Sequence, residues 1–170
     1  MKKIICLLWC ALFCFLLCAC DPGSYKAEDD LLEDVTSIDL ILYENSEQKA
    51  LQGWFKDHFD ELPAFDNSKT KVLETLPEEK ISKFLDAFSE KEILSTYYTY
   101  DSPADVCIRL NYSNGNFLII WSDYENNSFG GYIGVYSKDG MPESFLGVFS
   151  ALSFYKELIN DFFVYDISAN

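Results

Sequence analysis

The stretch ADVCIRLNYSNGNFLIIWS, residues 104–122, is the clearest local structure in this 170-residue chain. Two runs of strand-forming residues flank Asn114-Gly115, the pair favoured at the centre of a two-residue type I′ hairpin turn. Such a turn fixes which residues lie opposite each other. The register it predicts is Tyr112 with Phe117, Leu110 with Ile119 and Ile108 with Trp121 on a core face, and Asn111 with Leu118 and Arg109 with Ile120 on a mixed, partly solvated face.

Further elements are expected on both sides of this hairpin. Alternating apolar residues predict a strand over residues 36–43 and a second hairpin over residues 131–149, where Gly134 and its neighbouring glycines indicate a bulge or a close backbone approach. Helical spacing predicts a helix over residues 46–62 and a closing helix over residues 150–163, and residues 69–75 are ambiguous. Thr75-Leu76-Pro77-Glu78 resembles a capping box and predicts another helix from Thr75 to Phe88.

This order of elements predicts an α+β fold. We expect two layers: an antiparallel sheet of about four to six strands, packed by helices on one face, and a closing C-terminal helix. Residues 35–170 are expected to form a single globular domain, and about 150 exported residues suffice for one sizeable core.

The first twenty residues have the pattern of an export signal. Lys2 and Lys3 precede an uncharged apolar run, residues 4–19, and small Ala19 precedes a cleavage point. Sixteen residues span only about 24 Å as a helix, short of a hydrocarbon core of roughly 30 Å. A cleaved signal is therefore favoured over a retained transmembrane helix.

The signal resembles that of bacterial lipoproteins, because Leu17, Cys18, Ala19 and Cys20 fill a lipobox. The resemblance covers these twenty residues only, and Cys18 departs from the usual Ala, Ser or Thr. It implies that residues 1–19 are removed, that the Cys20 sulfur is lipidated, and that fatty acyl chains such as palmitate hold the protein on the extracytoplasmic face of a cell membrane. Residues 20–34 then read as the lipidated cysteine and an acidic tether.

Cysteine content and charge restrict the chemistry. Five of the six cysteines lie in the first twenty residues, so Cys107 has no second cysteine in the domain for a disulfide. The net charge is −15, and it becomes −17 without Lys2 and Lys3. This acidity argues against nucleic acid as a partner and favours a basic protein or simple solubility.

Catalytic and metal-binding patterns are weak. His58 is the only histidine and lies on the apolar stripe of a predicted helix, no Gly-x-Ser-x-Gly motif occurs, and no zinc-type ligand cluster occurs. Asp123, Glu125 and Asn127 alternate but lack the spacing of an EF-hand. We therefore expect no enzyme activity, no metal and no cofactor, although a carboxylate pair remains an open alternative.

Aromatic residues and one arginine are the candidate binding residues. Tyr97, Tyr98, Tyr100 and Tyr124 combine a broad ring with a polar tip, as interfaces favour, and they also suit ordinary strands. Arg109, the only arginine, either anchors a partner or pairs with an acid of its own domain, and we favour the second.

The sequence therefore predicts a membrane-anchored lipoprotein that acts as a non-catalytic binding module. The first hypothesis is a protein partner at the cell envelope, as for an immunity or inhibitor protein or an accessory subunit. The alternatives are a surface binding protein for a small molecule or sugar, which requires a concave pocket, and a carboxylate-based hydrolase.

Overall fold

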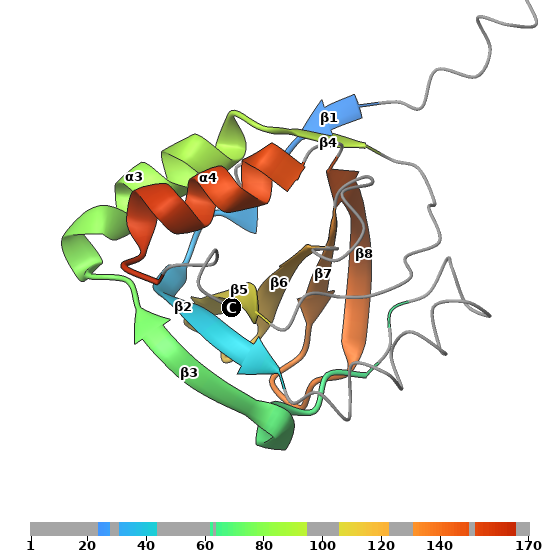
Figure 1. Ribbon diagram of the computed structural model, residues 1–170. Helices are drawn as coiled ribbons and strands as arrows, with labels where there is room; N and C mark the ends of the chain where they lie inside the picture. Colours follow the sequence, from blue (N-terminus) through green and yellow to red (C-terminus); the bar gives the residue numbers. More distant parts are fainter. Residues whose placement is uncertain are drawn as a thin grey trace, which may run out of the picture.

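A computed structural model of the chain describes residues 24–27, 31–43, 62, 64–94, 106–122, 131–149 and 152–165. These residues form an α+β fold built on one open antiparallel sheet and two helices (Figure 1). The predicted fold class is confirmed at this level. The predicted helix over residues 46–62 lies outside the described residues except for Leu62.

Six longer strands form the body of the sheet, in the order β3-β2-β5-β6-β7-β8, and two three-residue strands, β4 and β1, extend it beyond β8. Every pairing is antiparallel. The bounds are β1 Ser24–Lys26, β2 Val35–Tyr43, β3 Thr70–Thr75, β4 Glu92–Leu94, β5 Val106–Tyr112, β6 Phe117–Ser122, β7 Gly131–Tyr136 and β8 Pro142–Phe149. The second predicted hairpin is confirmed as β7–β8, and the predicted first strand as β2.

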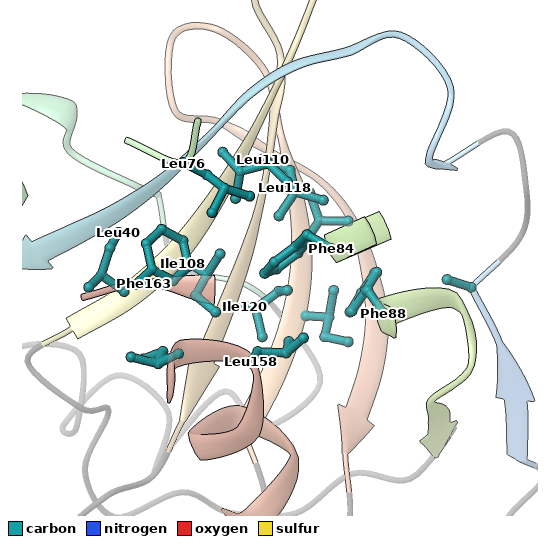
Figure 2. Packing of buried hydrophobic residues seen from close by; sticks show 14 of the residues in the cluster. Leu40, Leu76, Phe84, Phe88, Ile108, Leu110, Leu118, Ile120, Leu158 and Phe163 are labelled. Atoms are coloured by element: carbon teal, nitrogen blue, oxygen red, sulfur yellow. The ribbon is translucent and has the colours of Figure 1, made fainter. Parts of the chain in front are cut away.

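The two helices are α3, Glu78–Ser89, and α4, Leu152–Phe162. Phe84 and Phe88 of α3 and Leu158 and Ile159 of α4 belong to one buried cluster with aliphatic side chains from the sheet (Figure 2). The sheet contributes Ile38, Leu40, Ile93, Val106, Ile108, Leu110, Leu118, Ile120 and Ile133. We call the side of the sheet that carries these residues the helix face.

The β5–β6 hairpin differs from its predicted register by one residue. Only Gly115 of the Asn114-Gly115 pair has a positive φ, of 88°, whereas a type I′ turn requires a positive φ at both positions. The amide of Tyr112 donates to the carbonyl of Asn116, so the loop has three residues. Leu110 therefore pairs with Leu118 and Arg109 with Ile119.

This shift moves every side chain of β6 to the other face of the sheet. Phe117, Ile119 and Trp121 lie beside Arg109, on what we call the second face, and all three are buried. The prediction of a partly solvated face was wrong, because residues that precede β3 cover it. Phe65 lies over the second face, with its ring centroid 5.3 Å from that of Phe117.

Glycine marks two close approaches on the second face. A Cβ at Gly134 would lie 2.5 Å from a methyl carbon of Leu62, and the β7–β8 register shifts at this residue, as the sequence predicts. Gly140 has a φ of +78° and accepts a 2.7 Å hydrogen bond from the amide of Phe65. A Cβ at Gly140 would lie 1.9 Å from the Phe65 carbonyl oxygen.

The predicted capping box at Thr75 was wrong. The helix begins at Glu78, its N-cap is Pro77, and no side chain caps it. Thr75 is the last residue of β3 and donates its hydroxyl proton to Asp39 instead, at 2.7 Å. The pattern was misread because the ambiguous segment, residues 69–75, contains strand β3, and Thr75 is the last residue of that strand.

The N-terminal segment belongs to the fold from β1 onward. Strand β1 pairs with β4, and Ala27 is 6% exposed within the core cluster. Tyr112 donates its hydroxyl proton to the carbonyl of Leu31, and the Ser113 amide donates to Asp34. The described part of the predicted tether, residues 24–27 and 31–34, therefore packs on the domain because it supplies apolar and backbone partners.

Candidate functional site

Of the predicted site residues, the structure describes Arg109 alone. Cys20, Tyr97, Tyr98, Tyr100 and Tyr124 lie outside the described residues, as do His58, Asp123, Glu125 and Asn127. Their roles stay predictions. Among the described residues, Arg109 and the surface grooves are therefore the candidate binding features.

Arg109 projects from β5 onto the second face and forms an ion pair with Asp39 of β2. Its Nη2 donates to Asp39 Oδ2 at 3.2 Å, and the side chains are 17% and 9% exposed. The two residues are direct cross-strand neighbours in the β2–β5 ladder. The favoured interpretation of Arg109, pairing with an acid of its own domain, is confirmed.

Asp39 also accepts two neutral hydrogen bonds. Asn111 Nδ2 donates to Asp39 Oδ2 at 2.7 Å, and the Thr75 hydroxyl donates to Asp39 Oδ1. Asn111 Nδ2 also donates to the hydroxyl of Ser37 at 2.9 Å. Both carboxylate oxygens are thus satisfied, as the burial of a charge requires. The network joins β2, β3 and β5, which indicates a structural anchor.

Arg109 also contacts the segment that precedes β3 and covers the second face. Nη1 donates to Asn67 Oδ1 at 3.2 Å, and the guanidinium carbon lies 5.8 Å from the Phe117 ring centroid. Asn67 opens a short 3₁₀ turn that Asp66 caps, and hydrogen bonds from Ser68 lower the pKa of Asp66. Within the described part of the chain, the buried Nε–H of Arg109 has no acceptor.

Cys107 lies on the same face, opposite Trp121, and is 1% exposed. Burial raises the pKa of its thiol, and the neighbouring Trp121 indole and the Arg109 charge offset only part of this effect. A neutral, enclosed thiol is a poor nucleophile. The described residues contain no group of three or more His, Cys, Asp or Glu side chains placed to hold a metal ion.

A groove of about 570 Å³ runs between the start of β2 and α3. Val35, Ile81 and Leu85, which are half-buried, provide its apolar lining, and exposed Glu78 and Asp86 lie eight positions apart on α3. At 1.5 Å per residue these two acids are about 12 Å apart along the helix axis. The groove thus combines apolar contact area with carboxylates spaced along its length.

A smaller hollow of about 240 Å³ lies beside the β5–β6 turn. Asp34, Tyr112, Asn114 and Asn116 are among its lining residues, and Tyr112 is the one aromatic among them. Its volume is below the roughly 300 Å³ at which small-molecule pockets usually begin. This hollow therefore does not supply the aromatic-lined pocket that a sugar would require.

The sequence analysis missed the groove between β2 and α3. Its signal was present, because Glu78, Ile81, Ser82, Leu85 and Asp86 follow the i, i+3, i+4, i+7, i+8 spacing of one helix surface. Ile81 and Leu85 belong to both this surface and the buried stripe, so the pattern was attributed to the core alone. Asp39 was missed because it occupies a polar position in an alternating strand.

No protein family, curated protein or solved structure matches this chain. In the described residues no helix has the length and apolar content that a membrane crossing requires.

Proposed function

We propose that this chain is a lipoprotein, anchored through lipidated Cys20 on the extracytoplasmic face of a cell membrane, whose domain binds a protein partner of the envelope. The lipobox Leu17-Cys18-Ala19-Cys20 supports the anchor. Two or more acyl chains suffice for stable anchoring without a basic patch. The role is non-catalytic, of the immunity, inhibitor or accessory-subunit type.

The observation that carries the binding role is the groove between β2 and α3. Its apolar residues can enclose an apolar side chain, and Glu78 and Asp86 can each meet a basic side chain that flanks it. The net charge, −17 after the loss of Lys2 and Lys3, attracts a basic protein from a distance. We therefore assign the groove to a basic segment that carries an apolar anchor residue.

The finer architecture belongs to the same proposal. We place both helices on one face of the sheet, with α4 as the closing element, because their side chains share one cluster with the aliphatic residues of the sheet. Phe84 contacts the C-terminal end of α4, with its ring centroid 5.2 Å from that of Phe162. This layer fixes α3, and with it one side of the groove.

Capture with the full chain tests the binding role. The protein, tagged at its C-terminus, is crosslinked in its host and isolated from membranes as wild type, as E78K/D86K and as the matched control E79K. Glu79 is exposed on α3 but does not line the groove. We expect one polypeptide that wild type and E79K retain and E78K/D86K loses at least fivefold. Equal retention by all three, or no retained polypeptide, contradicts the proposal.

The anchor has a separate test. Cys20→Ala is expected to abolish labelling by a fatty acid precursor in a bacterial host that processes lipoproteins, and to leave the signal uncleaved. Wild type is expected to incorporate label and to fractionate with membranes. Label retained by the C20A variant would contradict lipidation at Cys20 without bearing on the groove.

A further inference from the structure

Strand β3 is the last strand at one end of the sheet, opposite the end formed by β1 (Figure 1). It pairs with β2 on one side, and no strand among the described residues pairs with its other side. Such an edge presents a row of backbone donors and acceptors to any strand that approaches. Val72, in the middle of β3, is 46% exposed.

Two features of β3 limit which strand can be added. Lys71 is an exposed charge on the edge, and the β2–β3 register shifts between Leu40 and Ile41, which indicates a bulge. Charged side chains and bulges disfavour unspecific strand addition. An added strand must therefore place an acid opposite Lys71 and a base opposite Glu74.

We propose that the strand that meets this requirement is β3 of a second copy of the same chain. In an antiparallel pairing with its two-fold axis between the two Val72–Leu73 segments, Lys71 of each copy lies opposite Glu74 of the other, Thr70 lies opposite Thr75, and the two bulges interrupt the ladder at the axis. The two ion pairs are related by a two-fold axis, so the contact is closed and self-complementary. Opposite charges at directly facing strand positions stabilise the pair.

The register within the chain places both charges on the same face. Lys71 pairs with Leu42 and Glu74 with Leu40, and both leucines pack in or against the helix-face cluster. Directly opposed residues of an antiparallel ladder project to one face. Glu74 also accepts the amide of Val164 at 2.9 Å, and a carboxylate has further acceptor positions for Lys71 of the second copy.

The overall charge opposes this association and predicts its salt dependence. Two anchored copies, which each carry −17 after the loss of Lys2 and Lys3, repel at long range, and the screening length shortens from about 30 Å at 0.01 M salt to about 8 Å at 0.15 M. The ion pairs between β3 strands act at contact distance and are screened less. We expect pairing to strengthen as salt rises from 0.01 to 0.15 M.

Charge reversal across two differently tagged full-length copies tests the proposal. Both are co-expressed in a bacterial host, membranes are solubilised in excess detergent, and the recovery of one tag with the other is measured. We expect K71E with K71E, and E74K with E74K, to lose at least fivefold of the wild-type recovery. K71E with E74K restores it, because each interface then again holds two opposite pairs. The control K83E, an equal change on exposed α3, behaves as wild type.

A second variant keeps the test valid where E74K fails to fold, since Glu74 also holds Val164. V72D places two acids beside the two-fold axis at a residue that is 46% exposed, and V72T is its matched control. We expect V72D to lose recovery at least fivefold and V72T to retain it. Undiminished recovery of K71E with itself or of V72D, or a folded K71E and E74K mixture that stays unpaired, overturns the proposal.

Discussion

The two faces of the sheet are both buried, but they are built from different chemistry. The helix face carries aliphatic side chains and the phenylalanines of α3, and every member of its buried cluster is apolar. The second face carries the Arg109–Asp39 ion pair and a cluster of aromatic rings in which Phe65 contacts Phe117, Trp121 and Tyr136. The helix face is stabilised by the packing of apolar side chains, whereas the second face also depends on hydrogen bonds to its buried charges. Different substitutions should therefore destabilise the two faces.

Phe84→Ala should have the largest effect, because it removes the central ring of the helix face. Phe84 is fully buried, with ring centroids of Phe162 and Phe163 at 5.2 and 6.4 Å. We expect a loss of about 4 kcal/mol in the free energy of unfolding, measured by urea denaturation. Phe84→Leu, which retains most of the volume, should lose far less. Equal losses for both variants would show that packing volume does not dominate this face.

On the second face, substitution of Asp39 should reduce the free energy of unfolding more than substitution of Arg109. Asp39→Ala leaves the buried Arg109 guanidinium with Asn67 as its remaining described hydrogen-bond partner, and we expect a loss of about 3 kcal/mol. Arg109→Met leaves Asp39 with the hydrogen bonds from Thr75 and Asn111, so the loss should be nearer 1 kcal/mol. The same urea experiment measures both losses. The opposite ranking would contradict the assignment of Asp39 as the centre of the network.

The sequence predicts the helix face better than the second face for a physical reason. Alternation and helical spacing identify most strands and the stripe of α3, since these signals are local. The hairpin register depended on the φ of Asn114, which the Asn-Gly pair does not determine. Asp39 and Arg109 are 70 residues apart in the sequence, and the local pattern around each of them predicts a solvent-facing residue. Their burial follows from a long-range pairing that no local pattern records.

Alanine substitutions should destabilise the protein more at Gly140, which Phe65 approaches closely, than at Gly115 in the β5–β6 turn. Gly140 and Gly115 both have positive φ, so alanine strains the backbone at each by about 1 kcal/mol. At Gly140 the added Cβ would also meet the Phe65 carbonyl oxygen, and we expect a total near 2 kcal/mol. At Gly115 the nearest atom is Lys138 Cβ at 3.4 Å, an ordinary contact. Thermal unfolding of both variants checks this, and equal shifts in Tm would exclude a close approach of Phe65.

A pH dependence of stability is expected to arise at Cys107. Its pKa is raised by burial in the folded protein, while the unfolded chain keeps a value near 9.0. Below pH 9 both states hold the proton, so the thiol contributes no pH dependence. Above it the unfolded chain releases the proton and the folded protein retains it, so stability falls as pH rises, by about 1.4 kcal/mol between pH 7 and 10.

Cys107→Ala isolates this contribution from those of lysines and tyrosines that titrate in the same range. The difference in unfolding free energy between wild type and C107A, measured in urea at pH 7, 8, 9 and 10, should narrow or reverse toward pH 10. A constant difference would mean that the thiol ionises equally in both states and is therefore accessible to water in the folded protein. Because Cys107 lies opposite Trp121 on the second face, that result would also imply that the aromatic cover opens, in contrast to the helix face.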